Sequence, residues 1–81
     1  MWPDRSDRIN HNGPDLLWSQ VADDLREQIR SGELPSGSKL PNEWELSEAY
    51  QVARVTVRRA IIELRKEKLV TVTIGRGTFV A

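Results

Sequence analysis

Hydrophobic residues recur at helical spacing in three stretches of the chain and alternate with polar residues in a fourth. In the first stretch, residues 15–31, Val21, Leu25 and Ile29 stand four positions apart. This spacing places them on one face of a helix, so the sequence predicts an amphipathic helix that covers a core.

Local signals mark the two ends of this helix. Asp15 or Ser19 is the expected N-cap, because an oxygen on a short side chain accepts a hydrogen bond from an unpaired backbone N–H. Gly32 suits the left-handed residue that follows the last turn. Residues 33–38 have the composition of a turn, and residues 39–40 are expected to form a very short strand.

Residues 42–50 are predicted to form a second helix of about two turns. Asn42 is its expected N-cap, and Glu45 stands where its side chain closes a capping box. The inward positions are Leu46, Ala49 and Tyr50. Trp44 lies roughly 160° around the helix from Leu46, so we expect it to be mostly exposed.

Residues 51–67 read as one further helix with a hydrophobic and a basic face. The hydrophobic stripe consists of Val57, Ala60, Ile61 and Leu64. The other side carries Arg54, Arg58, Arg59 and Arg65. Guanidinium groups match phosphates and guanine edges, so this face suits duplex DNA. The alternative is a charged face that is only solvated.

The second and third helices follow each other closely. Gln51 and Val52 provide a tight turn between them, and a short helix, a tight turn and a basic helix make the helix-turn-helix pattern. Gln51 stands where such a turn usually has Gly.

The C-terminal residues predict a β-hairpin. β-Branched residues alternate with Thr, and the positions expected to share one face are Val70, Val72 and Ile74. The Gly-Arg-Gly sequence of residues 75–77 then turns the chain into a second strand. Arg76 would stand at the tip, suited to a narrow minor groove. The alternative is that it only keeps the turn soluble.

The predicted fold class is therefore α+β: a winged helix-turn-helix over residues 15–81, with three helices followed by a C-terminal two-stranded β-hairpin wing. Residues 1–14 have no periodicity and are expected to be a flexible arm. Arg5 and Arg8 could carry this arm to DNA, but the neighbouring acidic residues cancel their charge. The single His11 is expected to be solvated.

Charge is distributed unevenly along this chain of zero net charge. Residues 1–50 contain five Lys and Arg against ten Asp and Glu, whereas residues 51–81 contain seven against two. The C-terminal part thus carries a basic footprint, which matters for a polyanionic partner. We expect the acidic part to neutralise it partly, at the back of the domain.

Composition excludes several kinds of site. The chain has no Cys, so it has no disulfide, thiol nucleophile or CxxC metal site, and we expect no cofactor and no metal. It has neither an apolar run of membrane-spanning length nor the apolar core of a signal peptide, so we expect a cytoplasmic protein that does not contact membranes.

Three separate motifs resemble the DNA-binding domain of the GntR family of bacterial transcriptional regulators. They read GELPSGSKLPNE in residues 32–43, VARVTVRRA in residues 52–60 and GRGTFV in residues 75–80. The resemblance covers residues 15–81. The closing motif is similar to that of the HutC-like branch, whose effector domain resembles a chorismate-lyase fold.

The resemblance implies which residues meet DNA. Arg54 and Arg58 match arginines that contact bases and phosphates, and Thr56 matches a hydroxyl that holds a phosphate. Gly75 and the rest of the wing tip match residues that enter the minor groove. Together with the faces predicted above, the expected DNA-binding residues are Arg54, Val55, Thr56, Arg58, Arg59, Gly75, Arg76 and Gly77, with Asn42 and Trp44 as further candidates.

The chain departs from the family pattern at three positions. Trp44 stands where the family usually has a DNA-facing Arg, and its indole has only one N–H donor. It either faces DNA or packs against the protein. Ala53 replaces the usual Ser or Thr cap of the third helix, which costs about 1 kcal/mol unless a phosphate takes that role. Ile62 lies on the outward side of the same helix.

The resemblance also implies the whole protein's role. It predicts a non-enzymatic transcriptional regulator, a repressor released by a small-molecule effector, that binds operator DNA as a homodimer. Because the chain stops after the wing, we expect an excised domain or a natural miniature, with the effector and dimer domain absent. The alternatives are a winged-helix module that binds protein, and the N-terminal domain of a fusion to a pyridoxal-phosphate aminotransferase-like domain.

Overall fold

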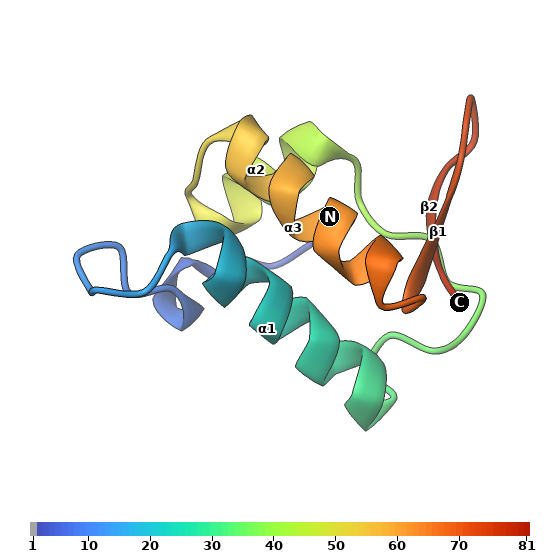
Figure 1. Cartoon of the computed structure of the whole chain (residues 1–81), viewed down its shortest axis with the longest axis horizontal. Helices are drawn as coiled ribbons and strands as arrows, with labels where there is room; N and C mark the ends of the chain where they lie inside the picture. The colour runs from blue at the N-terminus through green and yellow to red at the C-terminus, as the bar shows by residue number, and fades with distance from the viewer. Residues whose placement is uncertain (1) are drawn as a thin grey trace.

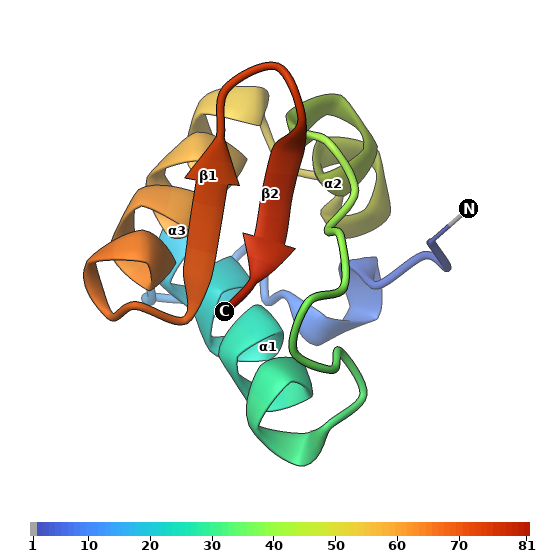
Figure 2. The ribbon, with the colours of Figure 1, turned by 90° about the vertical axis from the view of Figure 1, so that its right-hand side faces the viewer.

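The computed structural model describes residues 2–81, and its elements follow the predicted order. A short 3-10 helix, η1 (Ser6–Arg8), precedes three α-helices, which are α1 (Leu17–Ser31), α2 (Glu43–Tyr50) and α3 (Arg54–Lys66). Two antiparallel strands, β1 (Val70–Thr73) and β2 (Gly77–Val80), follow them. Figures 1 and 2 show the hairpin standing beside the C-terminal end of α3. The predicted winged helix-turn-helix is confirmed.

The core lies between α1, α2, α3 and the base of the wing. Its largest fully buried side chains are Val21, Leu25, Leu46, Tyr50, Val57, Leu64 and Val70. Each α-helix supplies the apolar stripe that its sequence predicted, and Leu40 and Val80 close the core under the hairpin. Burying one such aliphatic side chain stabilises the fold by roughly 1.5–3 kcal/mol.

Capping signals place both ends of α2 as predicted. The Asn42 side chain accepts from the Glu45 backbone N–H at 2.8 Å, and the Glu45 carboxylate accepts from the Asn42 N–H at 3.0 Å. Gln51 ends the helix in the left-handed region, with φ of 55°. A side chain tolerates this conformation at a cost of roughly 1–2 kcal/mol, so the turn forms without Gly.

Two predicted helix starts are wrong. The first helix begins at Leu17, and neither Asp15 nor Ser19 caps it. Instead, the Gln20 side chain holds the preceding loop, because its amide donates to the Asp15 carbonyl at 3.1 Å. The third helix begins at Arg54 and not at Gln51, since Gln51 terminates α2. Ala53 is its N-cap, as the family pattern implied.

The hairpin is paired as predicted, but its apolar face is not buried along its length. Val70 is 2% exposed, whereas Val72 is 37% and Ile74 98% exposed. The strands extend past the helices, so no core lies opposite their outer half (Figure 1). On its other edge β2 is bonded to residues 38–40, including an isolated bridge between Lys39 and Phe79 where a very short strand was expected.

Residues 2–11 make specific contacts with α1 and α2 that their sequence did not predict. Ile9 is buried, and the Trp2 ring meets the Tyr50 ring edge-on, with centroids 6.5 Å apart. The Arg5 backbone N–H donates to the Ala49 carbonyl at 2.7 Å. His11, expected to be solvated, places Nε2 3.1 Å from the Tyr50 carbonyl oxygen. The flexibility of residues 1–14 stays a prediction, and Met1 lies outside the described residues.

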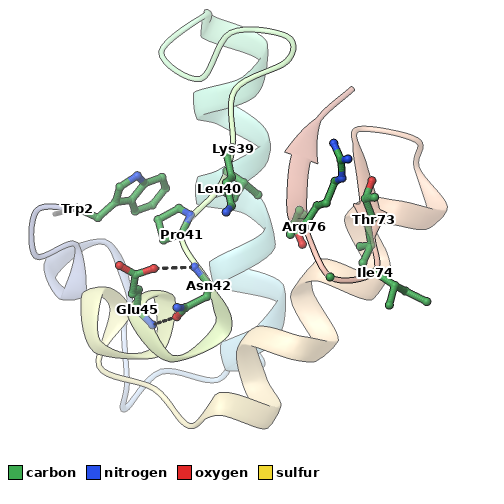
Figure 3. Close-up of a pocket in the computed structure, with 13 residues that line it drawn as sticks. Trp2, Lys39, Leu40, Pro41, Asn42, Glu45, Thr73, Ile74 and Arg76 are labelled. Carbon is green, nitrogen blue, oxygen red and sulfur yellow. Dashed lines mark hydrogen bonds between the residues drawn. The ribbon is translucent and has the colours of Figure 1, made fainter.

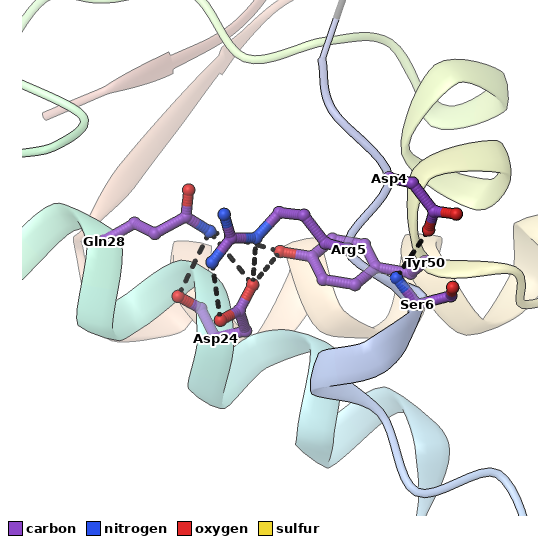
Figure 4. Close-up of polar contacts among 6 residues, drawn as sticks. All are labelled: Asp4, Arg5, Ser6, Asp24, Gln28 and Tyr50. Carbon is purple, nitrogen blue, oxygen red and sulfur yellow. Dashed lines mark hydrogen bonds and ion pairs between the residues drawn. The ribbon is translucent and has the colours of Figure 1, made fainter.

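The strongest of these contacts surround the carboxylate of Asp24 (Figure 4). Arg5 donates to both of its oxygens, through Nε at 2.7 Å and Nη2 at 3.0 Å. The Tyr50 hydroxyl donates at 2.6 Å and the Gln28 amide at 3.1 Å. Arg5 is therefore bound to the domain and does not project toward another molecule.

The surroundings of Asp24 also set its protonation. Burial alone would raise the pKa of its carboxyl group, but the hydrogen bonds from Arg5 and Tyr50 hold that pKa below its usual range. Burial and the bond to Asp24 raise the pKa of the Tyr50 hydroxyl well above its usual range. Asp24 is thus a carboxylate, and Tyr50 a neutral donor, at neutral pH.

Replacing Arg5 should destabilise the fold strongly. Arg5→Ala leaves the Asp24 carboxylate without its cationic partner in a site that is only 7% exposed, so we expect a loss of about 3–5 kcal/mol in the free energy of unfolding. Urea denaturation at neutral pH measures it. Arg8→Ala, at the exposed end of η1, is the control and should change stability by less than about 0.5 kcal/mol. Equal effects of the two substitutions would show that the network does not stabilise the fold.

Candidate nucleic-acid interface

Three parts of the fold share one side of the molecule. The first turn of α2, the first turn of α3 and the tip of the wing all lie on the upper side in Figures 1 and 2. The capping box fixes the first turn of α2. The turn at Gln51 ends α2, and α3 begins shortly after this turn. We call this side the recognition face; it contains residues 42–44, residues 53–58 and residues 74–77.

Two arginines of α3 are held together on this face by one carboxylate of α2. Arg58 forms a two-pronged ion pair with Glu43, with Nε 3.0 Å from Oε2 and Nη2 2.9 Å from Oε1. Arg54 donates to the same Oε1 through Nε at 3.3 Å. The hydrogen bond from Arg58 lowers the pKa of Glu43, so this carboxyl group is charged at neutral pH. Both guanidinium groups remain more than half exposed.

Arg59 is not part of this cluster, although the sequence grouped it with Arg54 and Arg58. Its guanidinium carbon lies 4.8 Å from the centre of the Trp18 ring on α1. Its Nε is 3.2 Å from a carboxylate oxygen of Glu63. A cation–π contact and an ion pair thus direct this side chain toward α1.

The start of α3 leaves donors without a protein cap. Ala53 occupies the N-cap position and provides no side-chain hydrogen bond. The first backbone N–H groups of a helix carry partial positive charge and suit an anion. Val55 is 63% exposed and Thr56 is partly buried beside them. This turn therefore has the chemistry of a phosphate site.

The wing tip carries two glycines and Arg76, and the Lys39 side chain lies beside it. Gly75 and Gly77 have φ of 80° and 125°, in the region that favours glycine. The Lys39 side chain runs past Gly77, where an added Cβ would lie 2.8 Å from its Cε. Figure 3 shows Lys39 and Arg76 on the two sides of a groove between the wing and the segment that leads into α2.

The two further candidates on α2 differ in their surroundings. The Asn42 side-chain oxygen is engaged in capping, so DNA contact by this residue would compete with the cap. Trp44 is 56% exposed, which excludes the core and agrees with the predicted outward position. It borders a shallow hollow that Trp2 also lines.

Sequence analysis missed Glu43 and Lys39. Glu43 was part of the family motif, but its partners lie eleven and fifteen residues away, beyond the reach of helical periodicity. The acidic half does neutralise the basic half partly, but the prediction that it does so at the back of the domain is wrong. There, Arg26 of the acidic half pairs with Glu67 of the basic half at 2.6 Å. Glu43 is the acidic-half residue that pairs with basic-half arginines, and it does so on the recognition face.

The part of the chain that the structure describes lacks the features of two other kinds of site. No helix there is long and apolar enough to cross a membrane. No group of three or more His, Asp and Glu side chains in these residues is placed to hold a metal ion.

Two named bacterial repressors are similar to this chain in sequence. HTH-type transcriptional repressor NagR of Bacillus subtilis is 40% identical over 73 residues, which are 90% of this chain and 30% of that protein. Mannosyl-D-glycerate transport/metabolism system repressor MngR of Escherichia coli is 44% identical over 64 residues, 79% of this chain and 27% of that protein. The chain thus spans less than a third of the length of these relatives.

A solved structure gives the same result for the fold. AraR(DBD), crystallised in complex with an operator, matches with a TM-score of 0.84 and 29% identity over 100% of both chains. The family model described as "Bacterial regulatory proteins, gntR family" matches residues 17–80, which include all three α-helices and the wing. The chain therefore belongs to the GntR family of bacterial regulatory proteins.

Proposed function

We propose that this domain reads operator DNA for a transcriptional regulator. The observation that carries the proposal is the pair Arg54 and Arg58, fixed by Glu43 at the exposed start of α3 on the side where the wing tip lies. The first turn of a recognition helix is the part that meets base edges in a helix-turn-helix. Held guanidinium groups suit guanine there, because two N–H donors match its O6 and N7.

The other expected contacts are divided between groove and backbone. Val55 offers an apolar surface to thymine methyl groups, and Thr56 and the uncapped N–H groups of α3 bind phosphate. Gly75, Arg76 and Gly77 approach the minor groove, and Arg59 reaches a phosphate only by leaving Trp18. Asn42 and Trp44 lie at the edge of this surface.

The whole protein's role is proposed from its relatives. NagR and MngR are named as repressors, and AraR(DBD) was crystallised with an operator. By analogy we assign a repressor that acts in the cytoplasm, binds two half-sites as a homodimer and is released by an effector bound outside these residues. The HutC-like branch remains a prediction.

A protein-binding winged helix is the second candidate. The exposed Trp44 beside Trp2 is the observation that favours it. The arginine pair on the recognition face favours DNA, because a protein-binding face has no need of two guanidinium groups around one carboxylate. A fusion to an aminotransferase-like domain would leave the DNA-reading role of residues 17–80 unchanged.

Substitutions along α3 test the proposed function. Arg54→Ala or Arg58→Ala should weaken binding to an operator selected from random duplexes by about 1–3 kcal/mol and relax base preference locally. Arg65→Ala, further along the same helix, should cost much less and equally on all sequences. Fluorescence anisotropy measures the affinity of each variant for the operator and for other duplexes. Repeated over a salt series, it should show an affinity that falls steeply with salt. A salt-independent affinity, or an Arg65→Ala effect as large as that of Arg58→Ala, would refute the proposal.

Glu43 should favour the correct operator over other DNA. Glu43→Gln removes a negative charge from beside two arginines, so affinity for nonspecific duplex should rise several-fold. It also releases Arg54 and Arg58 from their fixed positions, so discrimination between operator and random duplex should fall. Glu48→Gln, exposed at the other end of α2, is the matched control and should change neither. Undiminished discrimination in Glu43→Gln would mean that the ion pairs do not position the arginines.

Trp44 should affect binding and not folding. Because its side chain is 56% exposed, Trp44→Ala should lower the free energy of unfolding by no more than about 1 kcal/mol, against about 3–5 kcal/mol for a buried Trp. Trp44→Arg should raise general DNA affinity and steepen its salt dependence. Thermal unfolding and the salt series measure these effects. A large drop in the midpoint for Trp44→Ala would assign this residue to packing.

A further inference from the structure

The wing ends in a hydrophobic side chain that contacts nothing in the domain. Ile74 is 98% exposed, far more than any other large hydrophobic residue that the structure describes. Figure 3 shows it pointing beyond the turn, whereas the Arg76 side chain lies back along the hairpin. Ile74 is therefore an almost fully exposed hydrophobic side chain at the end of the wing.

Local structure does not account for an isoleucine at this position. The turn is closed by a hydrogen bond from the Arg76 N–H to the Thr73 carbonyl at 3.0 Å, and Gly75 has φ of 80°. These are features of a type II turn, whose second position favours Pro and small polar residues. A β-branched side chain fits a strand better than a turn. Neither the turn nor the core therefore requires Ile74.

The wing holds this side chain in a defined place. β2 is paired with β1 on one edge. On its other edge, the Leu40 N–H donates to the Thr78 carbonyl and the Val80 N–H to the Ser38 carbonyl, both at 2.8 Å. β2 is thus hydrogen-bonded on both edges, and Ile74 projects from a hairpin that this strand supports.

Charge around the tip is arranged for a nucleic acid groove. The exposed strand residues before it are Thr71, Val72 and Thr73, which carry no charge. The cations Lys39 and Arg76 lie further back, beside the groove at the wing's inner side. An apolar tip with cations behind it matches a minor groove, which has base edges at its floor and phosphates along its rims.

We propose that Ile74 is a specificity-determining residue that enters the minor groove of the bound duplex and packs against a flexible base step. The proposal rests on the proposed function. Pyrimidine–purine steps such as TA and CA unstack most easily, so an apolar wedge favours them over stiff A-tracts. The wing would then read deformability, while Arg54 and Arg58 read base edges.

Matched substitutions test this role. Duplexes are first selected from a randomised pool by the wild-type chain, and their affinities are then measured for Ile74→Thr and Val72→Thr. Both substitutions keep a β-branched side chain and alter no charge. We expect Ile74→Thr to lose about tenfold in affinity for duplexes with a flexible step under the wing, with an unchanged salt slope. Val72→Thr should stay within about twofold, because Val72 lies further down the strand.

A fluorescent base gives a direct readout of the wedge. 2-Aminopurine brightens when it unstacks, so scanning it through the selected duplex should reveal one bright step with the wild type and with Val72→Thr. That step should stay dark with Ile74→Thr. Thermal unfolding checks that all three proteins are equally folded, as expected for an exposed side chain.

The outcomes separate the two proposals. If Ile74→Thr retains both the affinity and the step preference, the wedge is wrong and the DNA-binding function stands. If the wild-type chain recovers no duplex, the proposed function itself fails. If Ile74→Thr changes the sedimentation of the free protein and leaves DNA affinity intact, Ile74 contacts a second copy of the chain, and the wedge is equally refuted.

Discussion

The structure depends on one buried charge, the carboxylate of Asp24. A buried carboxylate is costly unless its oxygens receive hydrogen bonds, and here the donors come from three segments. Arg5 precedes α1, Gln28 lies one turn further along α1, and Tyr50 ends α2. Because all must meet one carboxylate, the position of α2 against α1 is fixed. The start of α3 lies four residues after Tyr50, so the recognition face depends on this geometry.

The Glu43 carboxylate also accepts hydrogen bonds from arginine side chains, but it orients them and does not hold the fold together. Its ion pairs lie in solvent, where such pairs contribute about 0–1 kcal/mol to stability. Their effect is orientation: two flexible guanidinium groups share one carboxylate and lose freedom before any partner arrives. The short helix that carries Glu43 would be marginal alone. The capping box supports its start, and bonds from Arg5 and His11 to its last carbonyls support its end.

Local information was sufficient for the helices, the capping box and the hairpin, because their signals lie within a few residues. It was insufficient where the partner is distant. Asp24 stands three positions after Val21 and so on the buried face, but nothing in the aperiodic segment around Arg5 identifies its partner. The alternation of β-branched residues with Thr predicted that Val72 and Ile74 share one face with Val70. It does not show how far along the strand the core extends, and the core ends at Val70. Arg59 lies beside Arg58 on the helix, and only the fold brings Trp18 close enough to turn it away.

The charges of the domain favour discrimination over general affinity. With a net charge of zero, the chain gains little long-range attraction to a polyanion. On the recognition face, Glu43 further reduces the charge around Arg54 and Arg58. Under the proposed function, it would repel any phosphate that is not placed for these two arginines. Such a repulsive element lowers the affinity for wrong sequences more than for the right one. Under the proposed role of Ile74, an apolar contact at the wing tip follows the same logic, because a contact that depends on groove shape adds affinity only where the sequence permits it.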